Sequence, residues 1–163
     1  MILTLTALLP FLLQTPPSPR TAGNPALRPQ HQALKTLLQE GATRSPTFRD
    51  LLTALDHSTA IVYLRHGVCG SGVPACLRVQ GTPKSGPILL VTVDPFDRSR
   101  DAQTALVAHE LQHAREIANA DTCNPAEIAK LLERLGWHGR AGFETAEAQR
   151  VTLAVQNELA AHR

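Results

Sequence analysis

The chain has 163 residues, of which 43% are hydrophobic, so it is long and apolar enough to bury a core as one globular domain. Sixteen basic and fourteen acidic residues give a formal net charge of +2. This balance, with no run of lysine or arginine and no aromatic stacking platform, excludes a nucleic-acid-binding surface from the expected functions.

The N-terminal residues 1–13, MILTLTALLPFLL, are apolar but too few to span a bilayer as a helix. They resemble the apolar region of a secretory signal, and the segment that follows is rich in Pro, Thr and Ser, as in an extended leader. We therefore expect a signal peptide and leader over residues 1–28, a single domain over residues 29–163, and a secreted or periplasmic protein without membrane attachment after cleavage. The alternative is that the apolar run forms a strand or helix of the mature fold.

Two helices are expected next. The apolar spacing of PQHQALKTLLQE predicts a helix over residues 29–40, ended by Gly41. Ser45 as N-cap and Pro46 at the first helical position predict a second helix. Its apolar face would consist of Phe48, Leu51, Leu52 and Leu55.

The hydrophobic pattern then changes to short apolar and β-branched runs at residues 60–65, 75–80 and 87–93, separated by Gly, Pro and Ser clusters. These runs predict three strands of a small sheet. Cys69 and Cys76 flank a turn-rich loop between two of the strands. They either form a disulfide in an oxidising compartment, in which case Cys123 has no cysteine to pair with, or stay unbonded.

The C-terminal half is predicted to be helical. Asp101 can cap a helix that runs to about residue 120, Pro125 begins a helix that Gly136 closes, and a final helix follows from about residue 143. The order of two helices, three strands and three helices indicates an α+β fold rather than alternating βαβ units.

The first of these C-terminal helices contains the motif H-E-x-x-H, formed by His109, Glu110 and His113. Two histidines four residues apart lie on one helical face, so both imidazoles can bind one Zn²⁺ ion. Glu110 is turned about 100° around the helix axis, so it can take a proton from a zinc-bound water instead of binding the metal. This pattern predicts a hydrolytic zinc site.

Chance can also produce this motif, on a helix with ordinary surface histidines. Here, however, the helix is apolar around most of its circumference, through residues such as Val107, Leu111 and Ala114. Gln112 and Arg115 are expected on its solvent-facing side. Buried histidines and carboxylates need partners, which favours a metal. A ferritin-like di-iron site would need a second Glu-x-x-His, which the sequence lacks, and the surroundings of the only upstream cysteine candidate do not match a deformylase-like site.

Glu144 is the candidate third ligand. It begins a stripe of core-facing residues on the final helix and is therefore expected to point inward; the stripe continues through Ala148, Val151, Val155 and Leu159. Glu147 is rotated off this stripe and is expected to accept a hydrogen bond from a histidine N–H. The alternative for Glu144 is a favourable charge near the N-terminus of the helix dipole.

These residues resemble the gluzincin branch of the zinc metallopeptidases, the thermolysin-like group. The resemblance implies that His109, His113 and Glu144 bind zinc and that Glu110 is the general base. It also implies a small zincin-like domain in which a three-stranded sheet packs on the active-site helix and a C-terminal helix carries the third ligand. The strand at residues 87–93 would be the sheet edge that binds an extended peptide.

The resemblance leaves the residue that stabilises the oxyanion open. His138 is the first candidate because it lies close to Glu144 in sequence, and Tyr63, His66 and Arg140 follow. Glu116 is expected to be a surface residue or a partner of a ligand.

The leading prediction is a monomeric zinc-dependent peptidase that acts on a peptide or protein substrate. A metal-stabilised binding or interaction domain without turnover is the alternative, and zinc-dependent hydrolysis of another substrate also stays open.

Overall fold

The computed structural model describes residues 25–70, 72–96, 98–120, 124–139 and 142–162. The predicted signal peptide and most of the leader lie outside these residues, as does Cys123. Along the described chain the elements are β1 (Leu27–Pro29), α1 (Gln32–Arg44), α2 (Pro46–Asp56), β2 (Ile61–His66), β3 (Ala75–Gly81), β4 (Ile88–Val93), α3 (Arg100–Ala118), α4 (Pro125–Leu135), β5 (Gly136–Gly139), β6 (Gly142–Thr145) and α5 (Ala146–Ala161).

The predicted α+β class is confirmed, but the main sheet has four strands in the described part of the chain rather than three. Its order is β1-β2-β4-β3; β1 and β4 run parallel to β2, and β3 is antiparallel to β4. The additional strand is β1, which falls where we expected the leader and the start of a helix. Three residues are too few to display an alternating pattern, so this strand depends on its pairing with β2.

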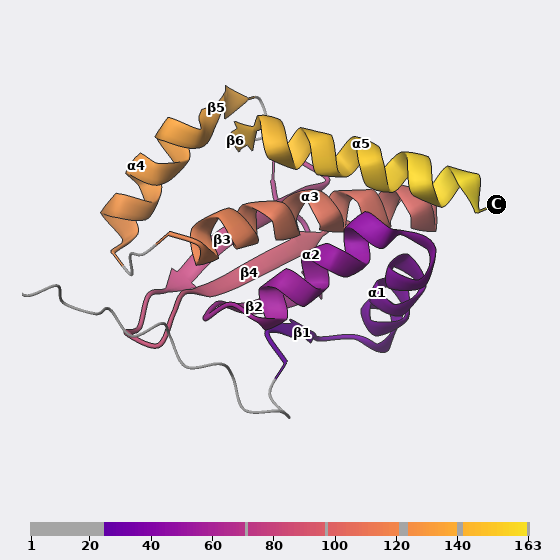
Figure 1. The fold of residues 1–163 in the computed structure, drawn as a ribbon, viewed down its shortest axis with the longest axis horizontal. Helices are drawn as coiled ribbons and strands as arrows, with labels where there is room; N and C mark the ends of the chain where they lie inside the picture. The colour runs from indigo at the N-terminus through magenta and orange to yellow at the C-terminus, as the bar shows by residue number, and fades with distance from the viewer. Residues whose placement is uncertain (1–24, 71, 97, 121–123, 140–141, 163) are drawn as a thin grey trace, which may run out of the picture.

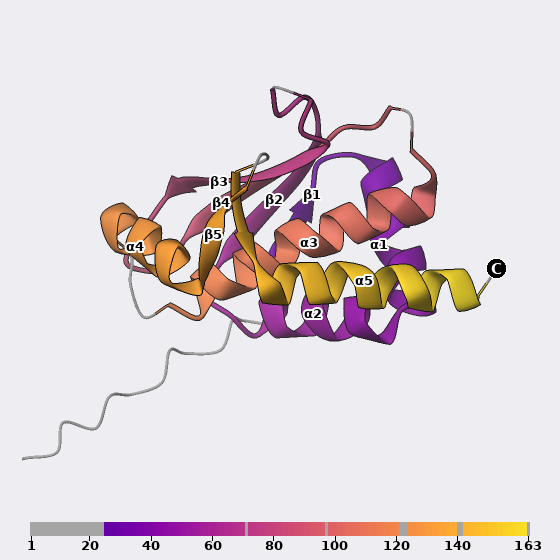
Figure 2. The same cartoon turned by 90° about the horizontal axis from the view of Figure 1, so that it is seen from above.

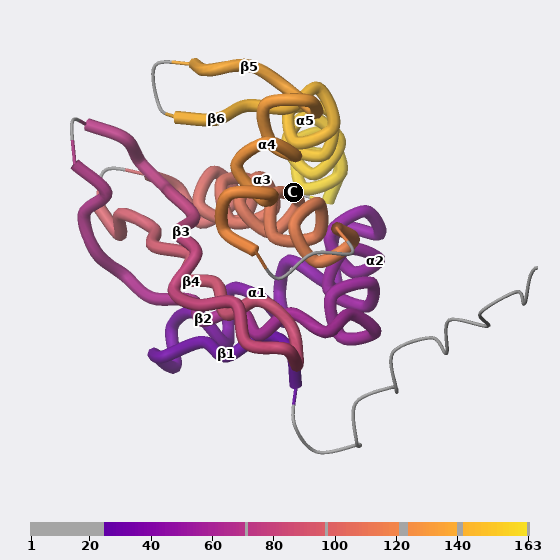
Figure 3. The backbone as a smooth tube through the Cα atoms, turned by 90° about the vertical axis from the view of Figure 1, so that its left-hand side faces the viewer, coloured from indigo at the N-terminus to yellow at the C-terminus, as the bar shows by residue number. Residues whose placement is uncertain are grey.

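The prediction that residues 87–93 form a sheet edge is wrong. Strand β4 is interior, because it pairs with β2 on one side and with β3 on the other. The order of strands along the chain does not determine their order in the sheet. Here β3, which precedes β4 in sequence, forms the edge that lies beside α3. Figure 3 shows β3 and β4 side by side, with β2 and β1 following in the sheet.

The helices cover one face of this sheet, with α3 directly against it and α5 packed on the other side of α3 (Figures 1 and 2). The sheet contributes its inward residues to the core, among them Val62 paired with Leu89 and Leu64 paired with Val91. One-sided burial of this kind produces the alternation seen along β2.

Helix α1 extends past Gly41 to Arg44, so the predicted end at Gly41 is wrong. Gly41 is buried where helices meet, and a Cβ there would lie 2.8 Å from side-chain atoms of Phe48 and Thr104. The glycine thus permits close helix packing instead of ending the helix. The predicted cap of α2 is confirmed, because the Ser45 side chain accepts a hydrogen bond from the backbone N–H of Phe48.

The C-terminal part differs most from prediction. Helix α4 ends before Gly136 as expected, but a two-stranded hairpin, β5–β6, separates it from α5. Helix α5 begins at Ala146 rather than near residue 143, since Thr145 is its N-cap and accepts a hydrogen bond from Ala148 N–H. Strands β5 and β6 form a separate two-stranded sheet in the described structure.

Cys69 and Cys76 form a disulfide, which joins the loop after β2 to edge strand β3. The sequence had left this pairing open. Among the described helices, none has the length and apolar character required to cross a membrane.

Candidate metal centre

Helix α3 presents the predicted motif from within the core. Ten of its nineteen residues are buried, which confirms the expected burial. Two details differ: the N-cap is Ser99 rather than Asp101, which pairs with Arg44, and Gln112 is only 4% exposed instead of facing solvent. Gln112 is buried because α3 has elements on both of its long sides, the sheet on one and α5 on the other.

The three predicted ligands converge. Nε2 of His109 lies 3.2 Å from Nε2 of His113 and 3.4 Å from Oε2 of Glu144. One ligand atom from each of the three residues lies within 4.8 Å of the others. Two nitrogen atoms bound to a tetrahedral zinc at about 2.0–2.1 Å are themselves separated by about 3.3 Å. The histidine pair therefore already has the spacing of two metal ligands.

The outer nitrogen of each imidazole has its own partner. Nδ1 of His109 lies 3.0 Å from Oγ1 of Thr152, whose hydroxyl donates to the carbonyl of Ala148, so the threonine oxygen accepts from the ring. Nδ1 of His113 lies 2.9 Å from Oε2 of Glu116, a carboxylate that can only accept. We assign the ring protons to Nδ1 on this basis, which leaves both Nε2 atoms as free lone pairs.

This arrangement fits a cation. Two lone pairs and a carboxylate oxygen at these distances repel one another, and a positive ion placed between them would turn this repulsion into coordination. Burial lowers the pKa of His109, as does the neighbouring His113, so the ring is neutral at pH 7 as a metal ligand must be.

Glu116 supports the centre from behind. Burial alone would raise the pKa of its carboxyl, but hydrogen bonds from His113, Thr145 and Gln112 outweigh that effect and hold the pKa below its usual value. Glu116 is therefore an ionised acceptor that fixes the His113 ring. Glu147, which we expected in this role, instead pairs with Arg150 on the surface, because α5 begins later than predicted.

Glu144 reaches the centre from strand β6 and not from a helix, so the prediction of a helix-borne third ligand is wrong. Its two neighbours also contact the centre. The Phe143 ring lies edge-on to His113 with centroids 6.4 Å apart, and the Thr145 hydroxyl donates to Oε1 of Glu116 at 2.8 Å. Three consecutive residues of one strand thus contact three different members of the site.

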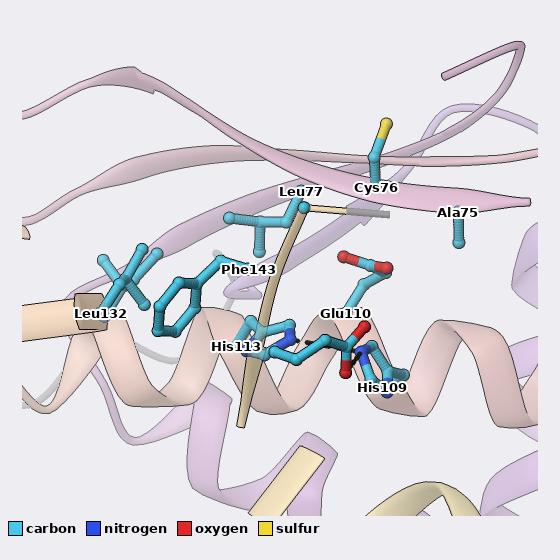
Figure 4. Close-up of a pocket in the computed structure, with 11 residues that line it drawn as sticks. Ala75, Cys76, Leu77, His109, Glu110, His113, Leu132 and Phe143 are labelled. Atoms are coloured by element: carbon cyan, nitrogen blue, oxygen red, sulfur yellow. Dashed lines mark hydrogen bonds and ion pairs between the residues drawn. The ribbon is translucent and has the colours of Figure 1, made fainter. Parts of the chain in front are cut away.

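Glu110 faces a cavity of about 130 Å³ beside the histidines, below edge strand β3 (Figure 4). The cavity lies between β3, α3, α4 and β6 and is mostly apolar; its lining residues are Ala75, Cys76, Leu77, His109, Glu110, His113, Ile117, Leu132, Gly142, Phe143 and Glu144. Glu110 is 8% exposed, and burial raises its pKa to about 7. His113 counteracts this shift, and Glu144 adds to it.

The structure does not bring the described oxyanion candidates to this cavity. His138 is exposed on β5 and packs against the Phe143 ring, while Tyr63 accepts a hydrogen bond from Arg28 on the main sheet. His66 stacks on a second histidine, and Arg140 lies outside the described residues. None of the described candidates is among the cavity lining.

Thr152 and Thr145 are the site residues that the sequence did not indicate. A threonine on a helix or at its N-cap carries no signal for a contact with a distant histidine or carboxylate. Glu116 was visible as a candidate because it follows His113 by three residues, on the same helical face.

Comparison with known proteins adds no relative: no family model, curated protein or solved structure matches this chain. The resemblance to gluzincins rests on the motif and its third ligand alone.

Proposed function

We propose that this protein is a zinc-dependent hydrolase with a zincin-like fold and that its substrate is a peptide. The main observation in support is that the ligand atoms of His109, His113 and Glu144 converge on one point. Thr152 and Glu116 at the same time bind the outer nitrogens of the two imidazole rings. Sites that merely bury histidines do not need two lone pairs directed at one point.

Two imidazoles and one carboxylate are the ligand set of catalytic zinc sites, which keep a fourth position open for water. When bound, zinc supplies Lewis acidity that brings the pKa of such a water close to neutrality. We therefore favour zinc over Ca²⁺ or Mg²⁺, which prefer sites made of oxygen ligands.

Glu110 is the proposed general base. It lines the same cavity as the three ligands, so it can accept a proton from a water there and return it to the leaving amine. The oxygen of that water joins the carbonyl carbon of the scissile bond, the carbon–nitrogen bond breaks, and an acid and an amine leave.

The peptide preference rests on β3. Among the described strands it pairs with β4 alone, and its residues Ala75 and Leu77 line the cavity. An extended peptide can add to such an edge through main-chain hydrogen bonds. The Cys69–Cys76 disulfide supports a secreted or periplasmic location, where disulfides persist.

A second candidate function is a metal-stabilised binding domain without turnover. It is favoured by one observation: among the described residues that line the cavity there is no Tyr, Arg or Lys to stabilise an oxyanion.

Metal analysis and two substitutions test both functions. We expect about one equivalent of zinc in the purified protein, and its loss in His109→Ala. Glu110→Gln should keep the zinc and the fold but lower the cleavage of a mixed peptide library about 100-fold or more. Glu133→Gln on the exposed face of α4 is the matched control and should cleave normally.

The outcomes separate the candidates. Less than half an equivalent of zinc in wild type contradicts the metal centre. Bound zinc with no cleavage of any peptide by wild type supports the binding domain instead.

A further inference from the structure

We propose that the β5–β6 hairpin is the element that completes the metal centre, and that Gly136 and Gly139 are positioning residues for the third ligand. The proposal rests on the metal centre described above, and it concerns why Glu144 reaches that centre at all.

The first observation is the isolation of this hairpin from the main sheet. Within the described part of the chain β5 and β6 pair only with each other, and of their eight residues only Thr145 is buried. Main-sheet pairing therefore does not set the place of Glu144, and the one buried anchor of β6 is Thr145, the N-cap of α5. Beyond that junction with α5, the place of Glu144 depends on contacts within the hairpin, with the neighbouring helices and with the centre.

The contacts with the centre come from three successive residues of β6. Phe143 packs on the ring of His113, Glu144 lies against His109, and Thr145 donates to Glu116. Shifting β6 along its axis by one residue would disturb all three at once, because successive side chains of a strand point to opposite faces. The register of β6 on β5 is thus the quantity that determines the ligand geometry.

Strand β5 fixes that register through its two glycines. A Cβ on Gly136 would lie 1.7 Å from the carbonyl oxygen of Glu144, and a Cβ on Gly139 would lie 3.0 Å from Cγ of Glu144. Gly136 has an extended backbone with φ −160°, which any residue adopts, so its requirement is the close approach and not the torsion angle. Both glycines therefore face the residue that binds the metal, and they leave room for it.

This geometry explains why the third ligand can come from a strand. The register pairs Gly136 with Thr145, Trp137 with Glu144 and Gly139 with Gly142. A side chain at Gly136 would push the backbone of β6 away from β5 and carry Glu144 with it. A side chain at Gly139 would displace only the Glu144 side chain, which has rotatable bonds.

The test is a double-mutant cycle on zinc affinity, measured by competition with a chromophoric chelator. Gly136→Ala should weaken Zn²⁺ binding by about 10- to 100-fold, the range found when a residue supporting a metal ligand is lost. Gly139→Ala should weaken it less. In the Glu144→Ala background, neither change should weaken binding further, because a positioning residue acts only through the ligand it positions.

Co²⁺ provides a second readout that a general loss of stability would not change. Its visible absorption is intense at four-coordinate sites and weak at six-coordinate ones. We expect the wild-type spectrum to be four-coordinate, and the Gly136→Ala spectrum to match that of Glu144→Ala. Gly81→Ala is the matched control, because a Cβ at the end of β3 meets nothing within 4 Å.

The results that would overturn the proposal are distinct from those that would overturn the function. Wild-type zinc affinity in both Gly136→Ala and Gly139→Ala contradicts the positioning role while leaving the centre intact. Equal losses with and without Glu144 also contradict it. If Gly136→Ala does not fold, the cycle with Gly139→Ala decides alone. Failure of the wild-type protein to bind zinc contradicts the centre itself.

Discussion

Helix α3 and the β5–β6 hairpin contribute to the same centre in opposite ways. The helix brings His109 and His113 from a core in which ten of its own nineteen residues are buried. The hairpin brings Glu144 from the surface, where Trp137 is 47% exposed and Thr145 is the one buried residue of strands β5 and β6 as described. Stability of the fold and completion of the metal centre are therefore separable properties, carried by different elements.

The largest expected effect tests this separation directly. Leu111 is fully buried on α3, so Leu111→Ala should reduce the free energy of unfolding by about 2–5 kcal/mol through lost burial and a residual cavity. Trp137→Ala on the exposed hairpin should change it by less than about 1 kcal/mol. Urea unfolding of the metal-free proteins measures both. A comparable loss in both variants would mean that the hairpin belongs to the core.

The next effect concerns the support of the helix-borne ligands. In Glu116→Gln the neutral amide accepts a hydrogen bond from the His113 N–H more weakly than the carboxylate does. The new NH₂ group is itself a donor, so it cannot accept from His113 or from the Thr145 hydroxyl. Zinc affinity should therefore fall about 10- to 100-fold. Chelator competition measures the affinity. Glu133→Gln, a change of the same kind on the surface of α4, should have no effect. An unchanged affinity in Glu116→Gln would show that packing alone orients the ring.

The same division explains what the sequence could predict. The helix-borne half of the centre followed from local rules: the spacing of His109 and His113 places both on one face, and the apolar residues around them predict burial. Glu144 was also correctly predicted to lie with the two histidines, because an inward carboxylate needs a positive partner.

The element that carries Glu144 could not be predicted in the same way. Its four-residue strand ends at the N-cap of α5, and so short a strand has no periodicity to distinguish it from a first helical turn. The edge position of β3 was also hidden, because strand order depends on how the parallel strands β1, β2 and β4 assemble in space. Local patterns thus predicted the helices and the members of the His-His-Glu cluster, while non-local pairing determined the edge and the hairpin.

A third prediction concerns the opposite wall of the cavity. The Cys69–Cys76 disulfide closes a loop with a sequence separation of 7, and its reduction should lower the free energy of unfolding by about 2 kcal/mol on a chain-entropy account. Urea unfolding with and without reductant measures this. Zinc affinity should stay the same, because neither cysteine is among the three ligands. A Cys69→Ser/Cys76→Ser variant that still responds to reductant would assign the effect to another group.

The smallest expected effect lies at the end of the molecule where α5 meets α2. Glu158 accepts hydrogen bonds from Ser45 and from the hydroxyl and backbone N–H of Thr47. Burial acts to raise the pKa of this carboxyl, but these hydrogen bonds outweigh it and the pKa lies below its usual value of 4.5. Because the unfolded chain binds the proton more readily, the stabilisation is present above pH 4.5 and is lost as the pH falls through the lower folded pKa.

Wild type should therefore lose more stability between about pH 6 and pH 3 than Glu158→Gln, in which no proton is taken up at this position. Urea midpoints at the two pH values measure the difference, which we expect to be under about 1 kcal/mol for a half-exposed group. At pH 7 the zinc affinity of Glu158→Gln should equal that of wild type, because Glu158 contacts the α2 end of the fold and no ligand. Parallel pH profiles in the two proteins would contradict the assignment of the hydrogen-bonded carboxylate, and a loss of zinc affinity would contradict the independence of fold and centre.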